Sequence, residues 1–312
     1  MVKKANPRHG SMQFWPRKRA KKLLTRVRTW TGKQAKPLGF VGYKVGMAHM
    51  MGAEQKGKLT LQHSIPVTLI ECPPIKIFSV RFYQKNSIQT EILSPKLDQD
   101  LKKRLPLPKE YSKKLDDVKD VYDQIRILTY TQPKLTSMGK KVPDIFEVAL
   151  GGSKEEQLTW VKENLEKEIN VKDVFEENIF VDIHAVTKGK GYQGVVKRFG
   201  VNLKSHRSEK GQRGVGARSG GWKAQAHMMY RVAQPGKMGF HQRTEYNKQI
   251  LKMEDTLPEE GIRHYGKIKN NFIIIKGSIA GSKKRPITIT NAIRAKRKPS
   301  TKIELKKLIL WN

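Results

Sequence analysis

The sequence predicts a mainly β protein that is interrupted by an α/β insertion, with the β part folded as a barrel. Short segments rich in β-branched and aromatic residues, ended by Gly or Pro, lie on both sides of a middle region with helical periodicity. That middle region is nearly neutral, whereas the parts that flank it are strongly basic. Short strands joined by Gly/Pro turns are typical of barrels, so we expect a split barrel with an inserted subdomain.

The charge of the chain points to a polyanionic partner. Its 312 residues hold 63 Lys and Arg against 28 Asp and Glu, a net charge of +35. Residues 91–180 hold 16 basic and 18 acidic side chains, whereas residues 185–252 hold 15 against two. Residues 1–53 hold 13 basic side chains and no acid. A folded chain with such an excess repels itself, and nucleic acid is the commonest polyanion that offsets it.

Several kinds of site and protein are not expected. Cys72 is the only cysteine, which excludes an intramolecular disulfide framework and a multi-cysteine zinc site. None of the eight His pairs at a metal-ligand spacing, no G-x-S-x-G motif occurs, and no metal or cofactor is expected. No run approaches the roughly 18 apolar residues of a membrane span. The start, MVKK, lacks the apolar region of a secretory signal.

Strands are predicted from residue type and alternation. Residues 65–71 and 75–83 are β-branched and aromatic, and two prolines separate them. Residues 272–275 and 287–290 predict two more short strands between turns. Residues 179–185 alternate at period two, with Ile, Val, Ile and Ala on the expected core face. The opposite face includes His184, which we expect at the surface or facing RNA.

The middle region carries helical signals. Ser153 and Glu156 have capping-box spacing, and the apolar positions that follow at steps of three and four are Leu158, Val161, Leu165 and Ile169. A weaker helix is predicted over residues 111–118, and a strand over residues 125–130 lies between the two helices.

These patterns predict the following organisation. A basic N-terminal arm covers residues 1–36. The split barrel comprises residues 37–84 and 176–312, and the α/β insertion comprises residues 85–175. A long basic loop within the second barrel half covers residues 204–250, where glycines are frequent and periodicity nearly vanishes.

The loop and the arm each allow two interpretations. Trp222 lies between glycines and cations, and it contacts RNA or docks back on the barrel; we prefer RNA because the loop offers no local core. Arg243 and Glu245, at the end of the loop, form a buried brace or contact RNA directly. The arm is a disordered tail or an RNA-binding segment, and its tryptophans, Trp15 and Trp30, favour RNA because disordered tails are poor in aromatic residues.

Residues 189–194 satisfy the pattern G-x-G-x-x-G after a predicted strand. A dinucleotide-binding unit also needs a helix next and an acid about 20 residues later, and neither is expected here. A basic glycine-rich turn whose backbone amides and cations approach phosphate explains the same residues.

The chain resembles the universal large-subunit ribosomal protein L-three family, over nearly its whole length. The likeness is carried by PRHGS and PRKR in the arm, GYKVGM at residues 42–47, a signature from Phe175 through residues 189–194 to Arg198, and GFHQRTEYNK at residues 239–248. The arm and residues 42–47 resemble the archaeal and eukaryotic branch, and the length indicates an archaeal source. One departure is that the residues after Trp222 lack the nearby proline of the family.

The resemblance implies a six-stranded barrel like those of translation factors, with an inserted α+β subdomain. It also implies binding to 23S-type large-subunit rRNA, a role in subunit assembly, no catalysis, and a cytoplasmic location in the large ribosomal subunit. The partners are that rRNA and neighbouring ribosomal proteins, with no membrane and a single copy per ribosome. The long loop, with Trp222 at its tip, is implied to reach toward the peptidyl transferase centre.

We therefore expect a structural rRNA-binding protein. The rivals are an RNA-modifying enzyme, which needs a pocket with an acid–base group or cofactor, and a nonspecific nucleic-acid-compacting protein, which binds duplex DNA equally well. The expected rRNA-binding residues are Arg8, His9, Trp15, Arg17, Lys18, Arg19, Arg26, Arg28, Trp30, Lys44, Lys188, Lys190, Lys197, Arg198, Lys204, Arg207, Arg213, Arg218, Trp222, Lys223, His227, Arg231, His241 and Arg243.

Overall fold

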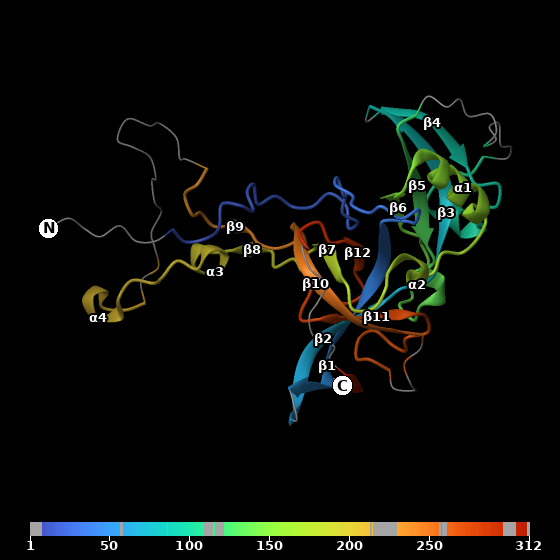
Figure 1. Ribbon diagram of the computed structural model, residues 1–312. Coiled ribbons are helices and arrows are strands. Elements are labelled where there is room, and N and C mark those ends of the chain that lie inside the picture. The colour runs from blue at the N-terminus through green and yellow to red at the C-terminus, as the bar shows by residue number, and fades with distance from the viewer. Residues whose placement is uncertain are drawn as a thin grey trace. The chain divides into compact units, whose positions relative to one another are not determined.

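The structure is a computed structural model that describes residues 8–56, 59–85, 87–108, 115, 122–212, 214, 230–255, 257, 261–295 and 304–310. Strands dominate these residues, as the sequence predicts (Figure 1). The weak helix predicted over residues 111–118 lies outside the described residues, apart from Leu115. None of the described helices has the length and apolar character needed to cross a membrane.

The chain divides into two compact units. The main unit comprises Lys22–Val186 and Arg243–Asn312, and the basic unit comprises Met1–Lys21 and Thr187–Gln242. The arm expected over residues 1–36 is therefore shared between the units and changes from one to the other after Lys21. The beginning of the chain thus folds with a segment almost two hundred residues later in the sequence.

A seven-stranded sheet forms the larger part of the main unit, in the order β12-β7-β10-β11-β2-β1-β13. Its strands are β1 (Gly39–Lys56), β2 (Leu59–Glu71), β7 (Phe180–Val186), β10 (Gln242–Glu254), β11 (Phe272–Lys276), β12 (Pro286–Asn291) and β13 (Glu304–Leu310). The strand β12 also pairs with β1, from Gly39 opposite Thr290 to Tyr43 opposite Pro286. The predicted strands over residues 65–71, 272–275 and 287–290 are confirmed within β2, β11 and β12.

A four-stranded sheet has the order β4-β3-β5-β6. Its strands are β3 (Ile75–Gln84), β4 (Ser87–Leu93), β5 (Gln124–Thr131) and β6 (Ile145–Ala149). The sequence places residues 75–83 in the barrel, but β3 pairs with β4 and β5. Proline has no N–H to donate, so Pro73 and Pro74 end the ladder of β2 and allow the chain to enter a different sheet. The second sheet therefore begins at Ile75, ten residues before the expected insertion.

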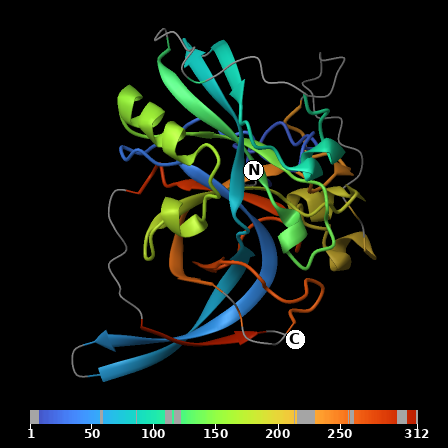
Figure 2. The same ribbon diagram turned by 90° about the vertical axis from the view of Figure 1, so that its right-hand side faces the viewer.

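The helix α1 (Lys154–Asn164) covers one side of the four-stranded sheet (Figure 2). Its predicted capping box is confirmed: the amide of Glu156 donates to Ser153 Oγ, and the carboxylate of Glu156 accepts from the amide of Ser153 at 2.9 Å. The buried Gln157 accepts a hydrogen bond from the Ile125 amide at 3.0 Å and so joins the helix to β5. The helix ends before Leu165, earlier than the apolar periodicity indicates.

Short helical turns also occur in the described part of the main unit. They are η1 (Gln99–Lys103), η3 (Pro133–Leu135) and α2 (Val171–Val174). The turn α2 begins with a second capping box, in which Asp173 accepts from the amide of Asn170 at 2.9 Å. Capping satisfies backbone donors that a helix of four residues leaves without an internal partner.

The two faces of β2 bury apolar side chains in different clusters. Ile70 belongs to a core that also contains Ile77 and Val80 of the smaller sheet, whereas Leu69 belongs to a second cluster with Phe272. Successive residues of a strand point to opposite faces, so both faces of β2 are covered. Complete burial of such a side chain contributes about 1.5–3 kcal/mol.

The expectation that His184 lies at the surface is wrong. His184 is buried, with Nδ1 3.0 Å from Thr244 Oγ1 and Nε2 3.1 Å from Thr290 Oγ1. The burial lowers the pKa of this imidazole below its ordinary value. The neighbouring Asp182 is also buried and accepts hydrogen bonds from the amides of Asn247 and Ile293 at 2.9 and 3.0 Å. Both faces of β7 are therefore buried, and its polar residues bind neighbouring segments.

A buried carboxylate holds the segment before β11. Glu71, at the end of β2, is completely buried and accepts a hydrogen bond of 2.5 Å from Tyr265 Oη. It also accepts from the amide of Lys269 at 3.0 Å and from Nδ2 of Asn270 at 2.9 Å. Burial, followed by the charge of Glu71, raises the pKa of Tyr265 far above its ordinary value. One side chain thus fixes three residues of the segment.

The described residues of the basic unit, 8–21, 187–212, 214 and 230–242, form little regular structure. Its elements are β8 (Tyr192–Gln193), α3 (Val195–Phe199), α4 (His206–Glu209) and β9 (Gly236–Lys237). The irregular loop expected to extend to residue 250 ends earlier, because β10 already begins at Gln242. The polar residues at the start of β10 hide its strand character, and Ile250 and Leu251 are its main apolar signal.

Candidate nucleic-acid interface

The basic unit concentrates the positive charge of the chain. Its 77 residues hold 19 Lys and Arg and one acid, a net charge of +18. The other 235 residues hold 44 Lys and Arg and 27 acids, a net charge of +17. The charge per residue is therefore about three times higher in the basic unit, which gives it the electrostatic character of a phosphate-binding surface.

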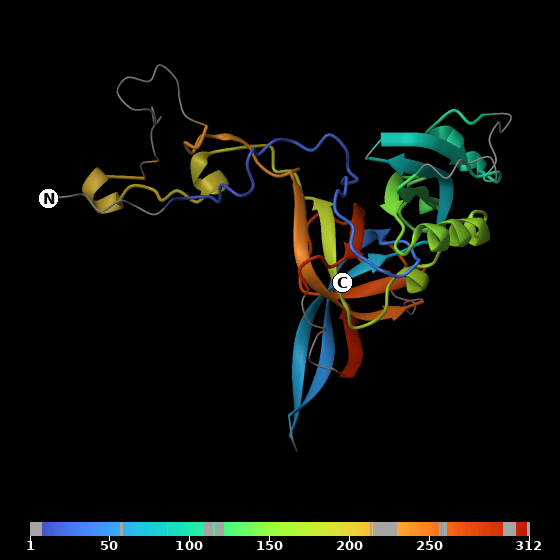
Figure 3. The same cartoon turned by 45° about the horizontal axis from the view of Figure 1, so that its top comes forward.

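The first part of the arm runs beside residues 187–242 (Figure 3), and hydrogen bonds join the two segments. Arg8 Nη1 donates to the carbonyl of Arg231 at 3.0 Å, and Arg17 Nη1 donates to the carbonyl of Arg198 at 3.0 Å. Close to the end of the unit, the Ala20 amide donates to the carbonyl of Phe240 at 2.9 Å. The bonds are spaced from Arg8 to Ala20, so this part of the arm runs along the later segment without a regular β ladder.

A cation–aromatic cluster, defined by Arg8, Trp15, Arg17, Arg198, Phe199 and Tyr230, reinforces these bonds. The guanidinium groups of Arg17 and Arg198 lie 4.3 and 5.1 Å from the centre of the Phe199 ring. The ring of Trp15 lies 6.2 Å from Phe199 and meets Tyr230 edge to face at 5.8 Å. Contacts between cations and aromatic faces stabilise by about 0.5–2 kcal/mol each. Trp15, which the sequence assigns to RNA, thus packs within the protein.

The close approach of the arm requires a glycine at position 10. Gly10 has φ of +84°, and a Cβ there would lie 2.7 Å from Cδ1 of Phe199 and 2.9 Å from Nη2 of Arg17. We expect Gly10→Ala to loosen the arm and to speed tryptic cleavage at residues 17–21 by roughly tenfold, as measured by limited proteolysis and mass spectrometry.

The matched control for this change is Gly200→Ala. Gly200 has φ of +68°, but a Cβ there meets no atom within 4 Å. Both substitutions therefore strain the backbone, and only Gly10→Ala collides with the cluster. Equal cleavage rates of the arm in the two variants would show that packing around Gly10 does not hold the arm.

The glycine-rich turn at residues 189–194 belongs to a small two-stranded ladder. β8 pairs with β9 in antiparallel orientation, and the amide of Met238 donates to the carbonyl of Gly191 at 2.8 Å. A helix does follow the turn, contrary to the expectation, but α3 has only five residues. A dinucleotide-binding unit needs a parallel β-α-β arrangement, which this antiparallel pair does not supply.

Most of the expected cations in the described part of the basic unit are exposed. Their side chains are accessible to phosphate without rearrangement of the backbone. The exposed residues among the expected set are Arg8, His9, Lys18, Arg19, Lys188, Lys190, Lys197, Lys204, Arg207 and Arg231, and in the main unit Arg26 and Arg28 are also exposed.

Besides the members of the cation–aromatic cluster, three more expected RNA contacts have structural roles. Lys44 is buried, and its Nζ donates to the carbonyls of Ile279 and Gly281 at 2.5 and 3.1 Å, with burial lowering the pKa of the amine. Trp30 packs partly buried against the main core. His241 is buried, and its Nδ1 donates to the carbonyl of Lys18 at 2.8 Å.

The remaining expected residues are intermediate or lie outside the described part. Arg243 is half-buried, which lowers the pKa of its guanidinium, and its neighbour Glu245 pairs with Lys248 at 3.1 Å. The residues that fall outside the described ranges are Arg213, Arg218, Trp222, Lys223 and His227.

Exposed aromatic residues were missed by the sequence interpretation. Tyr192 and Tyr230 are each 70% exposed, and Phe240 lies under the guanidinium of Arg19 at 5.0 Å. Large apolar side chains at the surface of a strongly basic segment indicate a contact surface. The position of these aromatic residues among glycines and cations was the sequence signal that could have predicted this contact surface. Among the described residues, no group of three His, Cys, Asp or Glu is placed to hold a metal ion.

Comparison with known proteins identifies the family. The model of the family described as Ribosomal protein L3 matches residues 1–114 and 107–310. The chain belongs to this family. A relative from Archaeoglobus fulgidus is 43% identical over 312 aligned residues, which cover 94% of this chain and 93% of the relative. Relatives from Methanocaldococcus jannaschii and Methanobrevibacter smithii are each 40% identical, over 92% and 96% of this chain and 91% and 95% of their own lengths.

All three of these L3 relatives bear the name "Large ribosomal subunit protein uL3". They are archaeal, which agrees with the archaeal source expected from the length of the chain and with the branch expected from the arm and from residues 42–47. The match covers both units of the chain, so the family assignment includes the basic unit as well as the two sheets of the main unit.

Proposed function

We propose that the protein is a structural constituent of the large ribosomal subunit that binds large-subunit rRNA and acts in subunit assembly. The observation that carries this proposal is the net charge of +18 on the 77 residues of the basic unit. A charge of this density neutralises several phosphates, which supplies affinity, while exposed aromatic side chains contact unpaired bases. The protein works in the cytoplasm, within the ribosome, as a single copy beside neighbouring ribosomal proteins.

The exposed cations of the basic unit contact the phosphate backbone in this proposal. Phosphate contacts fix the position and orientation of a protein on nucleic acid, and aromatic or base-edge contacts provide specificity. The segment that carries Trp222 extends toward the peptidyl transferase centre, as the family resemblance implies. The cation–aromatic cluster holds the arm in position for its RNA contacts: the rings of Trp15 and Phe199 pack within the protein, whereas Tyr230 remains 70% exposed.

The seven-stranded sheet supports a further proposal for the fold. The neighbouring pairs β12-β7-β10-β11-β2-β1, together with the pairing of β12 and β1, are consistent with a closed six-stranded barrel of the translation-factor type. The four-stranded sheet with α1 is the inserted α+β subdomain, whose near neutrality suits a surface that does not bind phosphate. The insertion begins at β3 in this division.

The protein is not an enzyme in this proposal, and the chemistry of peptide-bond formation belongs to the RNA. The relatives are named as ribosomal subunit proteins. The second rival, a nonspecific basic protein, differs in one measurable property. Specific contacts discriminate between sequences, whereas purely electrostatic binding does not.

Nuclease footprinting of large-subunit rRNA tests the proposal. We expect the full chain to protect discrete junctions, even in the presence of excess duplex DNA. A variant in which residues 205–229 are replaced by a short Gly-Ser linker keeps Tyr230 and β9, and it should lose a subset of these protections and retain the others. Uniform weak protection that duplex DNA removes would contradict specific rRNA binding.

A further inference from the structure

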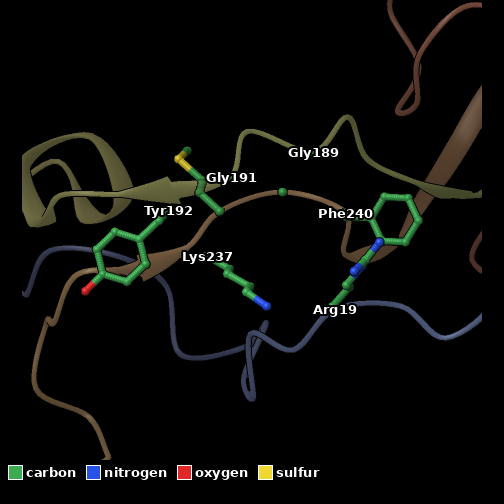
Figure 4. A pocket seen from close by; sticks show the side chains of 8 residues that line it. Arg19, Gly189, Gly191, Tyr192, Lys237 and Phe240 are labelled. Carbon is green, nitrogen blue, oxygen red and sulfur yellow. The ribbon is translucent and has the colours of Figure 1, made fainter.

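A cavity of about 270 Å³ lies within the basic unit (Figure 4). Three segments form it: Arg19 from the arm, the glycine-rich turn with Tyr192, and residues 237–240 of the returning strand. Its lining is largely apolar, contains three glycines, and includes the cations Arg19 and Lys237. Elsewhere in the described part of the basic unit, the exposed cations offer point contacts to phosphate.

We propose that this cavity binds one unstacked nucleobase of the large-subunit rRNA. The inference rests on the proposed function and names the ligand of one site within it. Proteins that recognise RNA by sequence bind bases splayed out from loops and bulges, stacked on aromatic rings or guanidinium planes and bonded along their edges. The cavity supplies each of these elements.

The aromatic surface is Tyr192. Its side chain is 70% exposed and lies on one side of the cavity, while Arg19 and Phe240 lie on the other side (Figure 4). A tyrosine ring offers a flat face to a base, and stacking of this kind is tolerant of base identity. Tyr192 belongs to β8, which pairs with β9, and its partner residue in that ladder is Lys237.

The edge-binding group is Arg19. Its guanidinium lies 5.0 Å from the centre of the Phe240 ring, a cation–aromatic contact that holds the group beside the cavity. A guanidinium carries N–H donors along its edge that match the carbonyl and ring-nitrogen acceptors of bases. Lys237 lies between the two walls and is exposed, so its amine reaches the phosphate of the same nucleotide (Figure 4).

The floor of the cavity is preformed. The amide of Lys190 donates to the carbonyl of Met238 at 2.9 Å, and the amide of Met238 donates to the carbonyl of Gly191 at 2.8 Å. Gly191 has φ of +68°, a conformation that glycine adopts without steric cost. Because the backbone is fixed before binding, little ordering entropy is lost when the base enters.

The size of the cavity favours a base over a larger ligand. Pockets for drug-sized molecules typically measure about 300–1,000 Å³, and this cavity falls just below that range. A free nucleotide offers the same chemistry as an rRNA base, but it lacks the neighbouring phosphates that the surrounding cations bind. The rRNA is therefore the expected source, and free nucleotides are one arm of the test.

Ultraviolet cross-linking of the full chain to large-subunit rRNA, mapped by mass spectrometry and primer extension, tests the inference. We expect the peptide that contains Tyr192 to cross-link to one nucleotide. Gly189→Leu should reduce this yield roughly tenfold, because Gly189 lines the cavity and the larger side chain would compete with the base for its space. The fold should tolerate the substitution, since Gly189 has no positive φ and its Cβ would approach Phe240 at an ordinary 3.6 Å.

Gly194→Leu is the matched control. Gly194 has φ of −67°, a Cβ there meets no atom within 4 Å, and it does not line the cavity. The cross-link should persist in this variant. Tyr192→Phe should retain the protection of the same nucleotide from chemical modification, whereas Tyr192→Ala should lose it, since stacking requires the ring and not the hydroxyl.

The outcomes separate this inference from the proposed function. Binding of rRNA by the full chain with no cross-link at Tyr192, or with a yield that Gly189→Leu leaves unchanged, would overturn the nucleobase site alone. Binding of AMP, GMP, CMP or UMP as tightly as a cognate rRNA fragment would instead assign the cavity to a free nucleotide. Failure of the full chain to bind rRNA would overturn both proposals.

Discussion

Raising the salt concentration from about 50 mM to about 200 mM is expected to weaken the binding of this protein to large-subunit rRNA by roughly a thousand- to a hundred-thousand-fold. Losses of this size are typical of proteins that make six to ten phosphate contacts, because each contact releases counterions from the nucleic acid. The exposed cations in the described part of the basic unit suffice for that number: Arg8, Lys18, Arg19, Lys21, Lys188, Lys190, Lys197, Lys204, Arg207, Lys210, Arg231 and Lys237. Filter binding across a salt series measures the slope.

Paired substitutions make this experiment specific. Lys190→Gln combined with Lys197→Gln should lower the log–log slope by about 1.4–1.8, because each lost phosphate contact contributes about 0.7–0.9. The control, Lys154→Gln combined with Lys162→Gln, removes two charges from α1 in the nearly neutral insertion and should leave the slope unchanged. A shallow slope for the full chain, or an equal change in both variants, would contradict the assignment of phosphate contacts to the basic unit.

Replacing Glu71 by alanine is expected to destabilise the main unit by roughly 3–5 kcal/mol. The substitution removes the acceptor of Tyr265 Oη, the Lys269 amide and the Asn270 side chain. The buried hydroxyl of Tyr265 then has no acceptor, and the Lys269 amide loses its bond. Nδ2 of Asn270 keeps only the carbonyl of Leu135 at 3.2 Å. A buried donor left without a partner costs about 1–3 kcal/mol. Urea unfolding followed by circular dichroism measures the change in the free energy of unfolding.

Two further variants serve as controls. One tests the effect of losing any glutamate, and the other measures how much a single hydrogen-bond donor contributes to the free energy of unfolding. Glu155→Ala removes an exposed carboxylate from the first turn of α1 and should change stability by less than about 0.5 kcal/mol. Tyr265→Phe removes only one donor, so its loss of stability should lie between the losses of Glu155→Ala and Glu71→Ala. A loss below about 1 kcal/mol for Glu71→Ala would mean that the segment before β11 is held by packing alone.

Local sequence patterns predict where helices and strands form better than they predict which strands and side chains contact one another. The capping box at Ser153 and the β-branched residues of β11 and β12 are local signals, and they were sufficient to predict α1 and these two strands. The pairing of β3 with β5 and the burial of His184 depend on residues far along the chain. The partners of His184, Thr244 and Thr290, are 60 and 106 positions away. Period-two alternation cannot reveal that both faces of β7 are covered.

The candidate interface likewise has features that the local sequence predicts and features that depend on distant residues. Composition and charge located the basic segments, but they could not separate exposed cations from buried ones. Lys44 has the same chemical character as Lys188, and only its burial against the carbonyls of Ile279 and Gly281 distinguishes its role. Arg17 bonds to a carbonyl 181 positions away, so the association of the arm with residues 187–242 leaves no trace in any local pattern.

The joining of the arm to residues 187–242 determines the route by which the protein can enter folded RNA. Because Arg8, Arg17 and Ala20 bond to the later segment at three points, we do not expect residues 8–20 to enter a narrow opening ahead of that segment. Both segments must dock together, and this requires a wide gap between RNA helices at that moment. A ribosomal precursor whose helices have already closed would exclude the protein, however many phosphates it still displays.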